Sequence, residues 1–168
     1  MADESDRALW RPMAQADLPA VFDLSKQIHE AYPERPEIAR ERLVLAPQWC
    51  RVLAPGDGLC GYLLAHPWRR GAPPALDSLI GALPDDPDCL YIHDLAIAPQ
   101  RRGKGDAAVL LASLKHEAFA DFPVIALIST GPATGFWQRQ GFAPRAIAQP
   151  EILAGYDPQA LYMEHPRP

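Results

Sequence analysis

The segment PQRRGKGDAA, from Pro99 to Ala108, is the part of this sequence best suited to hold a charged ligand. Two glycines one residue apart, Gly103 and Gly105, allow the backbone to approach a ligand closely, and an apolar helical pattern follows directly. The first N–H groups of a helix have no partner inside it, and with the helix dipole they favour an anion. Donors around this point are Gln100, Arg101, Arg102 and Lys104.

Three phosphate sites make different demands on the residues around these glycines. A Walker loop requires Gly-Lys followed by Ser or Thr, whereas Gly105 is followed by Asp106. A dinucleotide site fits the GxGxxA spacing, with Asp121 as its acid, but too little chain follows for the remaining βα units. A pyrophosphate on consecutive backbone N–H groups meets neither obstacle. A tight turn without any ligand is the alternative to all three.

Length and composition place these residues in one ordinary globular domain. The chain has 168 residues, of which 48% are hydrophobic and 22% charged. A net charge of −5 argues against general nucleic-acid binding, which leaves a basic footprint on a domain. Three cysteines without CxxC spacing indicate neither a disulfide framework nor a metal site. With no signal peptide and no apolar run long enough for a membrane span, we expect a soluble, cytoplasmic protein.

Hydrophobic periodicity predicts a mixture of strands and helices around the glycine loop. We expect strands at 8–13, 49–54, 59–67, 89–98, 124–129 and 160–165, and helices at 15–32, 36–46, 106–120 and 132–140. The turn PGDG joins the second and third strands into a hairpin. Residues 68–88 form a proline-rich loop in which 75–83 is a candidate short helix. The order strand, glycine loop, helix places the chemistry in the C-terminal half.

Two segments together resemble the GCN5-related N-acetyltransferase (GNAT) family. Its cofactor signature, [Gln/Arg]-x-x-Gly-x-[Gly/Ala] after a strand, is matched by Gln100, Gly103 and Gly105, and LAIAP before them looks like the family's strand end. TGPATGFWQRQGF resembles the second signature, Asn-x-x-Ala-x-x-[Leu/Phe]-Tyr-x-x-x-Gly-Phe. Its matching residues are Ala133, Phe136, Gly141 and Phe142, and its departures are Thr130 and Trp137.

The resemblance implies a fold and a reaction. The fold is α/β (α+β), a single domain over 1–168 with its core at about 8–165. A mixed central sheet of about six to seven strands is flanked by about four helices and splayed between the strands near 90–98 and 123–129. The reaction transfers an acetyl group from acetyl-CoA to a primary amine by direct attack in a ternary complex.

The resemblance also assigns cofactor residues. Backbone groups of Leu95, Ala96 and Ile97 would bind the pantetheine arm, and one N–H would polarise the thioester carbonyl. The pyrophosphate would lie on backbone atoms from Arg102 to Ala107. The whole expected set is Leu95, Ala96, Ile97, Gln100, Arg101, Arg102, Gly103, Lys104, Gly105, Asp106, Ala107, Thr130, Ala133, Phe136 and Trp137.

Catalysis raises two questions, because the attacking amine must lose a proton and the leaving thiolate must gain one. His93, in YIHDLAI, is the first candidate for proton acceptor, since it resembles a histidine of the arylalkylamine acetyltransferases. Asp94 competes with it, and on an extended strand should face away from His93 and Tyr91. Family members usually have tyrosine where Trp137 stands, and an indole is no proton source. Tyr91, Tyr156 or Tyr162 could serve instead, or the thiolate could leave without an acid.

The acceptor is expected to be a small-molecule or protein amine, bound near acids and aromatics of the first helices and later loops. Those residues are Glu30, Tyr32, Glu34, Trp68, Asp85, Asp86 and Asp88. A homodimer through an exposed final strand is a further expectation. Two other functions remain open: a catalytically degenerate coenzyme-A-binding regulatory module, raised by the missing tyrosine, and an NAD(P)-binding protein.

Overall fold

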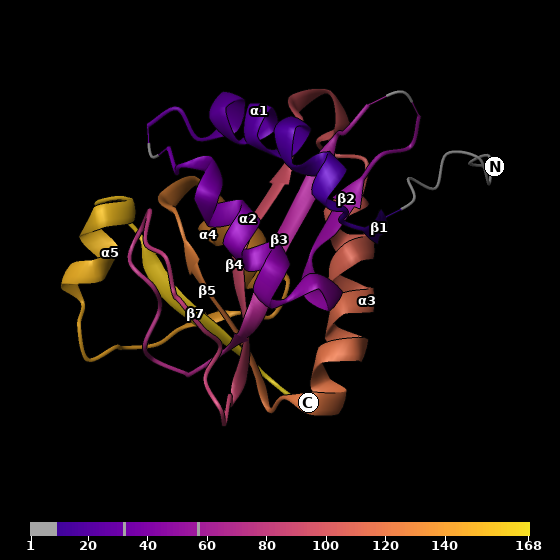
Figure 1. The fold of residues 1–168 in the computed structure, drawn as a ribbon. Coiled ribbons are helices and arrows are strands. Elements are labelled where there is room, and N and C mark those ends of the chain that lie inside the picture. Colours follow the sequence, from indigo (N-terminus) through magenta and orange to yellow (C-terminus); the bar gives the residue numbers. More distant parts are fainter. Residues whose placement is uncertain (1–9, 32, 57) are drawn as a thin grey trace.

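A single mixed sheet organises the chain, which we describe from a computed structural model for residues 10–31, 33–56 and 58–168 (Figure 1). Its seven strands lie in the order β1-β2-β3-β4-β5-β7-β6, with β4 and β5 parallel and the other pairs antiparallel. The strands are β1 (Trp10–Pro12), β2 (Arg51–Leu53), β3 (Gly61–Trp68), β4 (Cys89–Ile97), β5 (Val124–Ser129), β6 (Ala143–Pro144) and β7 (Leu161–Pro166). The sheet agrees with the expected fold.

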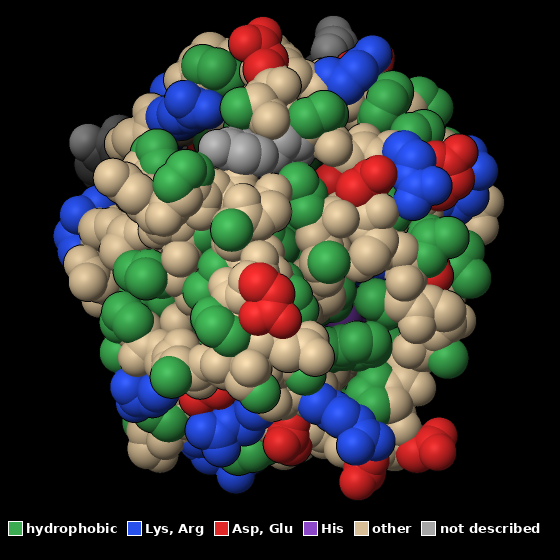
Figure 2. Space-filling view, turned by 90° about the vertical axis from the view of Figure 1, so that its left-hand side faces the viewer, with side chains coloured by type: hydrophobic (Ala, Val, Ile, Leu, Met, Phe, Trp, Pro, Cys, Tyr) green, Lys and Arg blue, Asp and Glu red, His purple; other side chains and the backbone are tan. Residues whose placement is uncertain are grey.

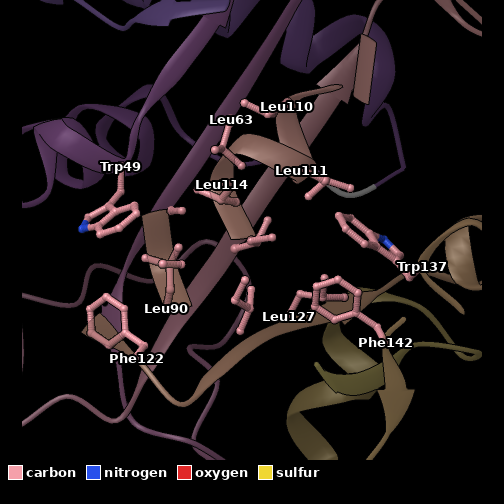
Figure 3. Packing of buried hydrophobic residues seen from close by; sticks show 14 of the residues in the cluster. Trp49, Leu63, Leu90, Leu110, Leu111, Leu114, Phe122, Leu127, Trp137 and Phe142 are labelled. Carbon is pink, nitrogen blue, oxygen red and sulfur yellow. The ribbon is translucent and has the colours of Figure 1, made fainter. Parts of the chain in front are cut away.

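Helices cover both faces of this sheet. They are α1 (Leu18–Ile28), α2 (Pro36–Leu45), α3 (Asp106–Asp121), α4 (Thr134–Arg139) and α5 (Glu151–Tyr156). On one face α1 and α2 pack Val21, Leu24 and Leu43 against β2 and β3. On the other face the leucines of α3 and Trp137 of α4 meet Leu90 and Leu127 in the main core (Figure 3). The sheet is thus the middle layer of three, as Figure 1 shows.

The two parallel strands separate part-way along their length. β4 pairs with β5 only from Leu90 to Ile92, opposite Ile125 to Leu127. Beyond Ile92, β4 continues to Ile97 with β3 as its neighbour and no pairing to β5. Backbone groups on that side of β4 therefore lack a strand partner, and the expected splay is confirmed.

A β-bulge interrupts the pairing of β4 with β3 at one residue. Leu64 pairs with Asp94 and Ala65 pairs with Ile92, so that His93 is the extra residue on β4. A bulge shifts the alternation of side chains by one position. The usual rule that neighbouring strand residues face opposite sides therefore fails at His93 and Asp94.

Three expectations about elements need correction. The short helix expected at 75–83 is absent, and all these residues are described. Instead Asp77 and Gly81 adopt positive φ, and Glu41 accepts hydrogen bonds from the N–H groups of Ile80 and Gly81. The final strand, β7, lies between β5 and β6 and is not an exposed edge. The helices number five among the described residues, because α5 was not predicted, and neither was β6. Ala8 and Leu9 of the first expected strand lie outside the described residues.

Candidate functional site

A cavity of about 850 Å³ opens where β4 and β5 separate. One end is formed by the glycine loop and the start of α3, from Arg101 to Ala108. Its middle runs along β4 from Ile92 to Ile97. The other end is formed by residues that follow α1 and precede α2, His29 and Glu34. One continuous space thus joins an anion-binding loop to a cluster of histidines and carboxylates.

The glycine-loop end has the backbone shape that its sequence predicts. Gly103 and Gly105 have φ of 78° and 84°, in the left-handed region where side chains are strained, and α3 starts at the next residue. Arg101, Arg102 and Ala107 also line the cavity here. Lys104 and Gln100 are exposed and are not among its lining residues. The side chain of Asp106 pairs with Arg101 instead of facing a ligand as a free charge.

At the opposite end, His93 is bound to Glu34. Nε2 of His93 lies 2.7 Å from Oε1 of Glu34, and the pair joins β4 to the loop before α2. Burial opposes the charge on Glu34, but the hydrogen bond and charge of His93 lower its pKa below the ordinary value. Because the ionised carboxylate only accepts, Nε2 of His93 carries the proton. Only 1% of the His93 side chain is exposed, and its Nδ1 is buried without a partner among the described residues.

Asp94 faces the same layer as His93, which corrects the expected opposite orientation. Its carboxylate accepts from the hydroxyl of Tyr62 at 2.5 Å and lies 3.0 Å from Nε2 of His29. Tyr62 belongs to the layer under α1 and α2, and His29 directly follows α1. The bulge at His93 explains the change, because it repeats one facing position along β4.

His29 is a site residue that sequence reasoning missed. It lies 65 residues from Asp94, and no motif connects the two. Burial opposes its charge, but Asp94 and Glu34 outweigh that effect and raise the pKa of His29. The pKa of Asp94 is lowered, since its contacts with His29 and Tyr62 overcome burial. The only available signal was its place at the end of the first helix, beside the region expected to bind the acceptor.

Trp137 lies at the boundary between the main core and the cavity. It is 7% exposed and packs edge-to-face with Phe136 at a centroid distance of 5.1 Å. It packs in the same way with Phe142, at a centroid distance of 5.3 Å (Figure 3). Trp137 and Phe136 also line the cavity, with Thr130 and Ala133. Its position is therefore compatible with packing in the core and with the expected contact with the cofactor.

A family model described as Acetyltransferase (GNAT) family matches residues 18–142, which include both ends of this cavity. The chain belongs to the GNAT acetyltransferase family. It is accordingly an acyltransferase, and the family supports a coenzyme-A-derived co-substrate. No curated protein has a sequence that matches this chain.

Solved structures agree with this GNAT fold over almost the whole chain. The loading GNATL domain of CurA from Lyngbya majuscula is similar with a TM-score of 0.78 and 12% identity, covering 95% of this chain and 97% of that one. The GphF GNAT-like decarboxylase, solved with isobutyryl-CoA, has a TM-score of 0.78 and 16% identity, covering 95% and 100%. The ribosomal-protein-S18-alanine N-acetyltransferase from Escherichia coli has a TM-score of 0.67 and 15% identity, covering 94% and 92%. At these identities, the likeness establishes the fold.

Among the tyrosines considered as acids in this GNAT chain, Tyr156 lines the cavity, while Tyr91 and Tyr162 do not. The Tyr156 hydroxyl donates to the carbonyl of Pro74 at 2.7 Å, and burial raises the pKa of Tyr156. Tyr91 is buried, and its hydroxyl contacts Tyr156. Tyr162 donates to Glu164 on β7. None of the three presents a readily released proton to the cavity.

Of the acids and aromatics expected around the acceptor, Glu34 lines the cavity. Tyr32 lies outside the described residues. Asp86 pairs with Arg69 at the surface, and Asp88 accepts from the backbone N–H of Arg70. Trp68 donates to the carbonyl of Ala72. Glu30 and Asp85 are not among the lining residues.

The surface and the helices of the GNAT domain carry further information on partners. On the face shown in Figure 2, Lys and Arg side chains alternate with Asp and Glu, without a region of one sign. Within the described residues, no helix is both long and apolar enough to cross a membrane. Nor do His, Cys, Asp and Glu side chains of the described ranges gather in a group suited to a metal ion.

Proposed function

We propose that this chain transfers an acetyl group from acetyl-CoA to a primary amine by direct attack in a ternary complex. The observation that carries the proposal is the continuous cavity, which joins the glycine loop to the carboxylates of Glu34 and Asp94 along β4. A cofactor in one half and an amine in the other would meet beside the free side of β4. Direct attack needs this proximity and orientation of the two reactants.

For the cofactor half, the proposal uses backbone groups of two segments. On the side of β4 that no longer pairs with β5, backbone groups from Leu95 to Ile97 would form hydrogen bonds with the amides of the pantetheine arm. These bonds would resemble those between neighbouring strands. Consecutive N–H groups from Arg102 to Ala107 would hold the pyrophosphate at the positive end of α3. The exposed side chains of Gln100 and Lys104 would reach only the outer, phosphorylated part of the cofactor.

For the acceptor half, the proposal favours a cationic amine. Glu34 and Asp94 both have lowered pKa values and are therefore ionised at neutral pH. Ile28 and Leu76 add apolar lining at the same end. A small-molecule amine or a protein amine, attached to an apolar group, fits these surroundings.

The leaving thiolate has no dedicated acid in this proposal. Trp137 replaces the tyrosine usual in the family, and Tyr156 already donates to Pro74. A thiol has a pKa of about 8.5, so that the thiolate can leave without a dedicated acid and take up a proton that the attacking nitrogen loses. Trp137 would then pack against the cofactor arm.

A coenzyme-A-binding module without turnover is the alternative that Trp137 raises, and the experiment is designed to exclude it. Calorimetry with coenzyme A and a thiol-release assay with acetyl-CoA over a panel of amines separate the two candidates. We expect micromolar binding together with amine-dependent thiol release. Binding without release on any amine would favour the regulatory module, and binding of NADH without coenzyme A would overturn both.

A further inference from the structure

His29 and Asp94 form a histidine–carboxylate pair at the acceptor end of the cavity. Nε2 of His29 lies 3.0 and 3.1 Å from the two carboxylate oxygens of Asp94. Tyr62 donates to the same carboxylate from the neighbouring strand β3. Asp94 is ionised and accepts only, so that the proton between the pair belongs to Nε2 of His29. The other ring nitrogen, Nδ1, then has a free lone pair.

Exposure distinguishes this pair from the second one, His93 and Glu34. One third of the His29 side chain is exposed, and His29 lines the cavity. Its Nδ1 makes no hydrogen bond within the described part of the chain. In His93 the corresponding Nδ1 is buried, with 1% of the side chain exposed. His93 also lines the cavity, but with 1% of its side chain exposed its ring is far less accessible to a substrate than that of His29.

We propose that Nδ1 of His29 accepts the proton of the attacking amine, and that Asp94 is a positioning residue that holds the ring in this tautomer. The inference rests on the proposed function. It replaces His93 with His29 as proton acceptor and leaves His93 to fix the bulge of β4 to the loop before α2.

The bound ammonium gives one proton to Nδ1 of His29, and the neutral amine attacks the thioester carbonyl carbon. The new C–N bond forms, the C–S bond breaks, and the electron pair leaves with the sulfur. The second proton lost from nitrogen neutralises the thiolate, and the first returns from His29 to solvent. The products are the amide, coenzyme A and one proton.

The charged and titratable groups around His29 set its pH behaviour. Asp94 on β4 and Glu34 in the loop before α2 both act on its charge, and Tyr62 on β3 acts through Asp94. Together they raise the pKa of His29 above its ordinary value of 6.5. The ring therefore becomes an effective base only at a pH above that value. The rate constant kcat/KM should therefore rise with pH through a step that lies above pH 6.5.

The test compares histidine variants at two pH values. We expect His29→Gln to lower kcat/KM by about 10²- to 10⁴-fold at pH 7 and by much less at pH 9.5, where more amine is already neutral. The affinity of this variant for coenzyme A should change by less than about twofold, because His29 lies at the end of the cavity opposite the glycine loop. Asp94→Asn should shift the pH step toward the ordinary histidine value. His116→Gln, on the exposed face of α3, is the matched control and should equal the wild type.

Two results would overturn the assignment while the proposed function stands: turnover by His29→Gln at the wild-type rate, or an equal loss at both pH values, which indicates packing. Nitrogen NMR of the labelled histidine rings gives a reading that does not require turnover. We expect neutral His29 to carry its proton on Nε2, and a proton on Nδ1 contradicts the proposal. Absence of amine turnover by the wild type would instead reject the proposed function together with this step.

Discussion

Arg101 and Asp106 are joined across the glycine loop by two hydrogen bonds. Nε of Arg101 donates to Oδ2 of Asp106 at 3.0 Å, and Nη2 donates to Oδ1 at 2.9 Å. Both side chains are largely buried, at 13% and 7% exposure. The pair spans Gly103 and Gly105, and it neutralises an acid that would otherwise repel a phosphate at the start of α3. It also holds the loop in shape before any ligand binds.

Removal of this acid should weaken coenzyme A binding, although it removes a negative charge. Asp106→Ala takes the paired carboxylate from Arg101 and frees the loop, so that we expect the free energy of unfolding to fall by about 1.5–3 kcal/mol. Calorimetry and urea denaturation measure the two effects. Asp121→Ala, exposed at the other end of α3, should stay within about 0.5 kcal/mol. Tighter cofactor binding by Asp106→Ala would show that Asp106 acts mainly through its charge.

Gly105 is required for its backbone conformation and not for space. A Cβ atom at Gly105 would meet nothing within 4 Å, but φ is 84°. We expect Gly105→Ala to lower the free energy of unfolding by about 1–2 kcal/mol and to weaken coenzyme A binding. Gly155 in α5 has equal space and no positive φ. Gly155→Ala should therefore raise stability by about 0.5–1 kcal/mol, and equal losses in the two variants would refute the explanation.

Glu41 attaches the loop 69–88 to α2. It accepts from Nη1 of the fully buried Arg42 and from the backbone N–H groups of Ile80 and Gly81. Glu41→Ala leaves that guanidinium without its carboxylate, and we expect a loss of about 3–5 kcal/mol in urea denaturation. Leu76 of this loop lines the cavity, so KM for the amine should also rise. Arg40→Ala, at an exposed position on the same helix, is the control. A similar loss of stability in Arg40→Ala would show that the effect does not come from the contacts of Glu41.

Glu164 should contribute to the acid sensitivity of the fold without affecting catalysis. Burial opposes its charge, but Arg70 and Tyr162 lower its pKa through hydrogen bonds. A lowered pKa stabilises the folded state fully above the unfolded value of about 4.3, and this contribution is lost as pH falls through the folded value. Unfolding measured from pH 7 to pH 3 should therefore show a weaker dependence on pH for Glu164→Gln. The same dependence of unfolding free energy on pH in the wild type and Glu164→Gln would contradict this prediction, and so would a changed kcat at pH 7.

Much of the fold follows from local pattern. The apolar runs at 89–98 and 124–129 and the helix after Gly105 lie within a residue or two of their observed bounds. The prediction of a helix at 75–83 was wrong because backbone groups of this segment form hydrogen bonds with side chains of α2. A local sequence pattern carries no information on such contacts. α5 was missed for a related reason, since it is a short helix whose Tyr156 is held by contacts with Pro74 and Tyr91.

For the site, the sequence by itself determined the glycine loop and the helix that follows it, because turn conformation and helix start depend on neighbouring residues. It also indicated which strand carries the candidate histidine. Only the tertiary structure decided that His93 is buried against Glu34 and that a bulge turns Asp94 to the same layer as His93. It also decided that His29 pairs with Asp94. These contacts join residues 59 and 65 positions apart, and packing of the layers sets them.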